Sequence, residues 1–286
     1  MTPELKLLSA QELPTLVTEI ADPPKQLYVR GTLPSHENKW LAVVGSRACT
    51  PYGRQVVKHL ISGLRGYPVV IVSGLAYGID AEAHKAAIDA GLITVAVPGS
   101  GLNSDVLYPK ANHGLAREIL AAGGAHLSEF KPDQKAADYT FPRRNRIMVG
   151  LSHATLVIEA QEKSGSLITA KLATEYNREL LVVPGSIFSE SSKGTHQFLK
   201  LGATPVTDAA DILQALGIVP RTVDESLMRT DLSEDEQRVF TLLASPLRRD
   251  ALIEKLELPI TDANILLSTM EIKGLITETL GLVKIV

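Results

Sequence analysis

Three arginines are grouped in the segment FPRRNRIMVG, which spans residues 141–150. Arg143, Arg144 and Arg146 surround Asn145 just before an apolar run that is typical of a buried helix. Positive charge near a helix start opposes the helix dipole, and no Asp or Glu lies within one turn of these arginines. Because guanidinium groups bind phosphate through a planar set of donors, we expect an anion to compensate some of them and a distant carboxylate to hold at least one.

Further groups that could bind anions occur in turns after short apolar runs. Glycine lets a ligand approach the backbone, and the free amides at a helix start attract phosphate. Each turn taken alone is also explained by an ordinary loop, a solvated cation or a serine cap. Together with the arginine cluster and its neighbours Phe141 and Asn145, the candidate site residues are Gly45, Ser46, Arg47, Lys110, Ser164, Gly165, Ser166 and Lys171.

Motifs for bond-breaking chemistry are missing from these turns. The turn after residue 44 is not G-x-G-x-x-G, and G-x-x-x-x-G-K-[ST] occurs nowhere in the chain. Asp80 and His84 can share a helix face, but a braced structural pair is the commoner outcome of that spacing. No cluster has paired carboxylates, a convincing Ser-His-Asp order or metal-ligand spacing. We therefore expect a polyanion-binding protein without enzymatic activity, cofactor or metal.

The elements that must position these residues alternate from residue 41 onward. Short β-branched runs alternate with helical patterns, which predicts βαβ units and a mainly parallel sheet. In such a sheet the ligand crevice lies outside the carboxyl ends of the strands. Strands are expected over 41–45, 69–74, 93–99, 126–129, 155–160, 180–185 and 204–207, and helices over 51–65, 77–90, 113–122, 144–152, 166–177, 194–201 and 208–216.

The chain divides into a large and a small domain. Residues 1–38 are expected to form an extension with a short helix over 9–21 and a connector to an edge strand, before a Rossmann-like domain over 39–217. Residues 218–231 have the composition of a linker. The segment 232–286 opens with a capping box, Ser233 and Glu236, and predicts a winged helix: helices over 234–244, 248–256 and 261–273, then a hairpin turning near Gly281.

Charge is distributed unevenly along the chain, whose net charge is -3. Residues 39–217 carry 18 Lys and Arg against 15 Asp and Glu, whereas residues 232–286 carry 6 against 9. A polyanion is therefore expected to bind the larger domain. The third helix of the small domain carries Asp262 and Glu271 against Lys273, which favours a protein-contact or regulatory role over DNA reading. The longest apolar runs are only strand-length, so we expect a cytoplasmic protein without a membrane partner.

Five segments in uninterrupted order resemble the DprA/Smf family, DNA processing protein A. They are GSR with TPYG, SGLAYGIDAEAH, YPKAN, FPRRNRI, and EAQEKSGSLITA followed by VVPG, and the likeness spans roughly residues 25–216. The resemblance implies an extended Rossmann-like domain and binding of single-stranded DNA without marked sequence preference. It also implies loading of the RecA recombinase in natural transformation and DNA recombination, a homodimer, and no enzymatic activity or cofactor.

By position, the family's DNA pocket implicates Arg47, the basic residues near Lys110, and the stretch from Phe141 to Arg146. The resemblance places Ser164, Gly165 and Ser166 at the same rim, and Phe141 or Tyr108 could stack on a base. Many members carry an N-terminal helical domain of the sterile-alpha-motif type, of which this sequence has at most a remnant. The tail from residue 232 resembles the winged helix of some members.

Two other classes of function remain open. Rossmann-like nucleotide hydrolases of the lysine-decarboxylase-like group share the general sheet and use PGGxGTxxE, whose glutamate acts on the sugar. Here the corresponding stretch is EKSGSLITAKL, without a glutamate at that spacing. A transcription regulator that reads DNA through its winged helix is the third possibility, against which the acidic tail counts.

Overall fold

The computed structural model describes residues 3–35, 37–162, 164–220, 233–243, 246–273, 275–279 and 281–285. The chain forms two compact units, Met1–Pro220 and Arg221–Val286, which are treated separately below. The expected linker over 218–231 falls outside the described residues from position 221 onward.

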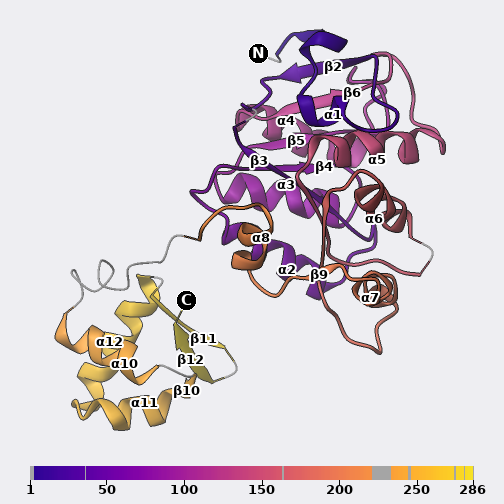
Figure 1. Ribbon diagram of the computed structural model, residues 1–286. Coiled ribbons are helices and arrows are strands. Elements are labelled where there is room, and N and C mark those ends of the chain that lie inside the picture. Colours follow the sequence, from indigo (N-terminus) through magenta and orange to yellow (C-terminus); the bar gives the residue numbers. More distant parts are fainter. Residues whose placement is uncertain are drawn as a thin grey trace. The chain divides into compact units, whose positions relative to one another are not determined.

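A nine-stranded sheet forms the centre of the first unit, in the order β1-β2-β6-β5-β4-β3-β7-β8-β9 (Figure 1). In this order β1, β2 and β6 pair antiparallel, and all pairs from β6 to β9 are parallel. The prediction of a Rossmann-like, mainly parallel sheet is thereby confirmed. The strands are β1 (Leu5–Ser9), β2 (Gln26–Gly31), β3 (Lys39–Val44), β4 (Val69–Ser73), β5 (Thr94–Ala96), β6 (Ala125–Ser128), β7 (Ala154–Val157), β8 (Glu179–Val182) and β9 (Thr204–Pro205).

Helices cover both faces of this sheet, so its central strands are apolar throughout. One face packs against α2 (Pro51–Ser62), α3 (Ile79–Asp89) and α8 (Ala209–Ala215), with α4 (His113–Ala121) beside α3. The other face packs against α1 (Thr15–Thr18), α5 (Thr140–Leu151), α6 (Gly165–Glu175) and α7 (Lys193–Lys200). No helix in the described part of the chain has the length and apolar character needed to cross a membrane.

The first residues of the chain differ from the expected extension and connector. Leu5–Ser9 is a strand rather than the start of a helix, and it occupies the edge position. The following strand, β2, lies inside the sheet between β1 and β6. Only Ala10–Glu12 and Thr15–Thr18 are helical here. The LKLL run lacks β-branched residues, and antiparallel pairing with β2 overrides that weak local preference.

The order of the strands reverses between β3 and β7. From β3 the chain proceeds through β4, β5 and β6 toward one edge, and from β7 through β8 and β9 toward the other. The connections that leave β3 and β7 therefore diverge to opposite faces, and a crevice opens between them at the carboxyl ends. This switch point determines where a ligand site can form.

Helix α5 begins earlier than the expected 144, at Thr140. The Thr140 hydroxyl donates to the Gly99 carbonyl at 2.6 Å and accepts from the Ala137 amide at 3.1 Å. Pro142 lies in the first turn, where the missing amide costs no helical hydrogen bond. The proline suggested a later start, but the contact with Gly99 fixes the first turn.

The second unit is a winged helix, as predicted. It contains α10 (Glu234–Leu242), α11 (Arg249–Leu256) and α12 (Ile260–Ile272), and a sheet in the order β10-β12-β11. The strands are β10 (Leu247–Arg248), β11 (Ile276–Thr279) and β12 (Leu282–Ile285). Ser233 and Glu236 form the expected capping box, and the hairpin turns at Gly281, whose φ is +76°.

Candidate nucleic-acid interface

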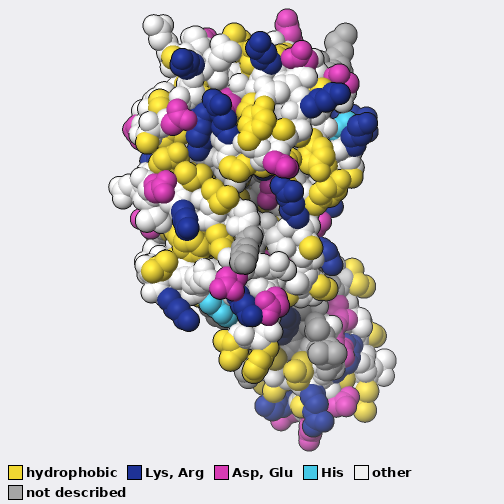
Figure 2. Space-filling view, turned by 90° about the vertical axis from the view of Figure 1, so that its right-hand side faces the viewer, with side chains coloured by type: hydrophobic (Ala, Val, Ile, Leu, Met, Phe, Trp, Pro, Cys, Tyr) yellow, Lys and Arg dark blue, Asp and Glu magenta, His cyan; other side chains and the backbone are white. Residues whose placement is uncertain are grey.

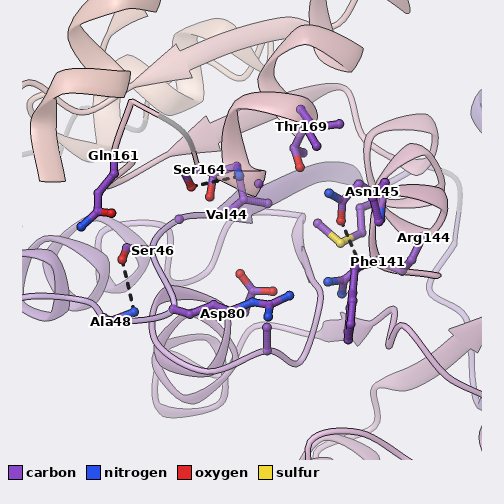
Figure 3. Close-up of a pocket in the computed structure, with 18 residues that line it drawn as sticks. Val44, Ser46, Ala48, Asp80, Phe141, Arg144, Asn145, Gln161, Ser164 and Thr169 are labelled. Atoms are coloured by element: carbon purple, nitrogen blue, oxygen red, sulfur yellow. Dashed lines mark hydrogen bonds between the residues drawn. The ribbon is translucent and has the colours of Figure 1, made fainter. Parts of the chain in front are cut away.

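A crevice of about 430 Å³ opens at the switch point. Its walls are the loop after β3, the loop after β7 with the first turns of α6, and the start of α5. Figure 3 shows Ser46 and Gln161 on one side of the crevice, Phe141 and Asn145 on the other, and Asp80 between them. The predicted site residues that the structure brings together here are Gly45, Ser46, Arg47, Phe141, Arg144, Asn145, Ser164, Gly165 and Ser166.

Two glycines allow the loop after β3 to lie close to the start of α3. A Cβ on Gly45 would come within 2.6 Å of the Ile79 side chain, and one on Gly78 within 2.2 Å of the Ser46 carbonyl oxygen. Gly78 also has a φ of +71°, which disfavours other residues. Gly45 lines the crevice, so its missing side chain serves both the packing of the loops and the access of a ligand.

Arg47 and Phe141 form the mouth of the crevice. The Arg47 Cζ lies 4.8 Å from the centroid of the Phe141 ring, within the range of a cation–π contact. Tyr108 packs against the other part of this ring, with centroids 5.7 Å apart and planes at 58°. Arg47 is exposed and forms no salt bridge within the described residues. Its donors are therefore available to an anion, beside two aromatic rings.

Arg144 is buried at the base of the crevice, with 4% of its surface exposed. Its Nη1 donates to the Val97 carbonyl, and its Nε donates to Asn145 Oδ1 at 3.1 Å. A Cβ on Gly74 would lie 1.7 Å from Nη1, so only glycine fits beside the guanidinium. Burial lowers the pKa of Arg144 to about 10, which leaves it charged at neutral pH. Arg144 therefore joins the ends of β4, β5 and α5 and adds positive charge to the crevice floor.

Asp80 is the acidic side chain that lines the same floor, and it is 5% exposed. Its Oδ2 accepts a hydrogen bond from the Gly74 amide at 3.1 Å. Burial raises the pKa of Asp80, while the nearby charge of Arg144 acts in the opposite direction. The carboxylate compensates Arg144 from the start of a different helix, as a distant structural partner would.

Arg146 and Arg143 share a second carboxylate, that of Glu129. Arg146 Nη2 contacts Glu129 Oε2 at 2.5 Å, and Arg146 Nη1 donates to the Asp22 carbonyl. Its side chain is 8% exposed, whereas that of Arg143 is 57% exposed and reaches the same Oε2 at 3.3 Å. Arg146 therefore connects α5 to the N-terminal segment, and neither of these arginines lines the crevice.

The other two predicted site residues lie outside the crevice. Lys110 begins a 3₁₀ turn, Lys110–Asn112, and lines a neighbouring hollow that also contains Phe141. Lys171 is on α6 but lines a different hollow, together with Glu175 and Glu179. Conversely, Gln161, Thr169 and Ile168 line the crevice without having been singled out as site residues. Gln161 follows a predicted strand end, which is the signal that could have indicated it.

Two buried histidines lie behind the site rather than in it. His84, fully buried, has Nδ1 2.7 Å from the Thr94 hydroxyl, and His126 has Nε2 2.9 Å from the Ala116 carbonyl. Burial is the main cause that lowers the pKa of His84 to about 3 and that of His126 to about 4. Asp80 and His84 thus do not act as a pair, since His84 contacts Thr94 instead.

We expect both rings to stay neutral well below pH 6. An NMR titration should show no midpoint above about 5 for either ring, with signals assigned by His84→Asn and His126→Asn. The unfolded chain takes up these protons near pH 6.5, so their contribution to the free energy of unfolding, full above that pH, decreases as the pH falls toward 4. A midpoint near 6.5 for either ring would contradict the burial argument.

Within the described residues, no group of three or more His, Cys, Asp or Glu is placed to hold a metal ion. The chemistry available in the crevice is therefore that of guanidinium, hydroxyl and amide groups next to aromatic rings. Such a set binds phosphates and stacks on bases.

Fold and site together define a class: a Rossmann-like domain with a cationic, aromatic crevice at its switch point, followed by a winged helix. The family model of DNA recombination-mediator protein A matches residues 4–217, and the DprA winged helix domain matches residues 227–281. The chain belongs to the DprA family, as the sequence resemblance predicted.

Several characterised proteins are similar to this chain. Protein Smf of Escherichia coli is 41% identical over 226 residues, which cover 79% of this chain and 60% of that protein. DNA processing protein DprA of Streptococcus pneumoniae is 45% identical over 199 residues, or 69% of this chain and 68% of that protein.

Two solved structures share the fold. That of Streptococcus pneumoniae DprA has a TM-score of 0.69 at 41% identity and covers 74% of each chain. That of Helicobacter pylori DNA processing protein A, described for its single-stranded DNA binding mode, has a TM-score of 0.67 at 31% identity and covers 76% of this chain and 98% of that one.

Proposed function

We propose that this protein binds single-stranded DNA in the switch-point crevice, without marked sequence preference. The observation that carries the proposal is the exposed guanidinium of Arg47 lying over Phe141 at the crevice mouth. A cation that binds phosphate next to a ring that stacks on bases is the combination used for single strands, and every base has a face to stack. The single-stranded DNA binding described for the Helicobacter pylori relative supports the same assignment.

The distribution of surface charge agrees with local contacts rather than with a broad basic surface. On the face shown in Figure 2, Lys and Arg side chains are interspersed with hydrophobic and acidic ones. A duplex-binding surface would be expected to present a more continuous basic stripe. Phosphate contacts in this protein would therefore be few and localised.

We further propose that the protein loads the RecA recombinase onto the bound strand in natural transformation and DNA recombination, as a cytoplasmic homodimer. Membership of the DprA family and the similarity to DNA processing proteins support this role. The aligned region spans 60% of the Escherichia coli relative, so the activity of the whole protein belongs to the proposal.

The expected test is binding to oligo-dT. The affinity should fall steeply as salt rises, with a slope of about −0.7 in log Kd-derived affinity per phosphate contacted, because each contact releases counterions. A gel-shift comparison should show tighter binding of the single strand than of a duplex of equal length. Equal affinity for both, or affinity independent of salt, would contradict the proposal.

We also propose that the crevice performs no catalysis. Asp80 is buried beside Arg144, and the nearby Glu159 is 2% exposed and accepts from the Thr50 amide at 2.9 Å and from the Thr50 and Ser191 hydroxyls. Neither carboxylate is presented to a sugar. Incubation with adenosine monophosphate should release no free base, and release of base would favour the nucleotide-hydrolase alternative.

For the winged helix we propose a protein-contact role rather than DNA reading. Helix α12 exposes Ile265 and Ile272, which lie seven residues apart on one face and are 61% and 88% exposed. A helix that enters a DNA groove needs polar and basic side chains there. If the isolated fragment 232–286 bound duplex DNA, the regulator alternative would gain instead.

A further inference from the structure

Two more hollows adjoin the crevice in sequence. The central hollow, of about 480 Å³, shares Phe141 with the crevice. The outer hollow, of about 540 Å³, shares Asp105 and Leu107 with the central hollow. The three cavities therefore form a track that leads from the switch point, past one aromatic ring, to the surface between α4 and the paired strands β2 and β6.

Both hollows carry cations that are free to bind an anion. The central hollow is lined by Lys110 and Lys135, and the outer hollow by Arg30 and Arg117. None of the four forms a salt bridge within the described ranges. Arg30 is held in place by the Pro3 and Leu102 carbonyls, to which its guanidinium donates at 3.0 and 3.4 Å.

The outer hollow also holds a buried polar side chain. His126 is 2% exposed and lines the cavity, and its Nε2 is engaged with the Ala116 carbonyl. Its Nδ1 makes no hydrogen bond with any residue that the structure describes. His126 lies directly opposite Arg30 in the register of β2 and β6, so the two side chains belong to one built wall.

Aromatic surface is continuous with the cations at the junction of the track. Tyr108 lines the central hollow, is 39% exposed, and packs on the Phe141 ring that also lines the crevice. The hollow that contains Lys171 differs, since it shares no lining residue with the crevice and includes Glu175 and Glu179. Only the hollows on the Tyr108 side prolong the proposed DNA site.

We propose that single-stranded DNA continues from the crevice past Phe141 through the central hollow into the outer hollow, where Lys110, Lys135, Arg117 and Arg30 receive successive phosphates. The inference rests on the proposed function and extends it, because it assigns a binding path and four cations to the part of the strand beyond the crevice. Longer strands should therefore bind more tightly than short ones by a margin that depends on the hollows.

The experiment compares oligo-dT of about six and about twenty nucleotides, lengths chosen to occupy the crevice alone or the whole track. Fluorescence anisotropy gives the ratio of the two affinities for the full chain, for Lys135→Gln and for Arg117→Gln. Each substitution should reduce the ratio about three- to tenfold and lower the magnitude of the salt slope for the longer strand by about 0.7. Both side chains are exposed, so the fold should be unaffected.

Lys58→Gln provides the matched control, since Lys58 is an exposed cation on α2 that lines none of these cavities. Its ratio should equal that of the parent protein. An unchanged ratio in Arg117→Gln would overturn the outer part of the track, and an unchanged ratio in both variants would overturn it entirely. If the parent bound neither oligonucleotide, the proposed function itself would fall, and the track with it.

Discussion

Replacing Arg47 with alanine is expected to weaken the binding of oligo-dT about 10- to 100-fold, because a hydrogen bond between charged groups contributes about 1.5–3 kcal/mol. Arg47 is the exposed guanidinium at the crevice mouth, and its removal also leaves Phe141 without the cation that lies over its ring. The protein should remain folded, since Arg47 forms no salt bridge in the described part of the chain. Fluorescence anisotropy gives the affinity, and thermal unfolding gives the stability.

Two further variants separate charge from geometry. Arg47→Lys keeps the charge but loses the planar set of donors, so its affinity should lie between those of the parent and the alanine variant. Arg65→Ala removes an equal charge from the surface outside the crevice, where Arg65 donates to the Asp89 carbonyl, and should leave the affinity nearly unchanged. An equal loss in Arg47→Ala and Arg65→Ala would show that only the net charge matters.

Replacing Arg146 with methionine is expected to destabilise the first unit by about 3–5 kcal/mol, which lowers its melting temperature by about 10 °C. The side chain of Glu129 is 7% exposed, and loss of Arg146 would leave this carboxylate buried with a single, exposed partner. The connection of α5 to the Asp22 segment would be lost as well. Thermal unfolding of the variant measures the effect.

Arg143→Ala is the matched control for this prediction. Arg143 lies on the same helix and reaches the same Glu129 oxygen, but its side chain is 57% exposed. Exposed ion pairs contribute only about 0–1 kcal/mol, so this variant should unfold close to the parent temperature. Similar destabilisation by both substitutions would mean that burial does not separate the two arginines.

Much of the architecture could be predicted from local patterns. The strands around 41–45 and 155–160 and the helices between them follow from alternation and periodicity, and the winged helix from the Ser233–Glu236 capping box. The rule that ligands bind at strand ends selected Arg47 and Ser164 correctly as neighbours in one crevice. The edge strand Leu5–Ser9 was missed, because its pairing with β2 is not encoded in its own residues.

The roles of the three arginines were beyond any local pattern. Arg143, Arg144 and Arg146 are nearly adjacent in the chain, yet one is exposed and two are buried. Their partners, Asp80 and Glu129, are distant in sequence, and only the packing of α5 across the ends of β4, β5 and β6 brings them close.

The sequence by itself determined that this chain forms a parallel α/β domain with cationic groups at its strand ends and a separate acidic winged helix. Those properties follow from residue types and spacings along the chain. The tertiary structure alone decided that Arg47, not Arg146, faces the crevice, and that further hollows adjoin it beyond Phe141. The physical reason is that burial and partner distance belong to the fold, so identical side chains become a brace in one place and a binding group in another.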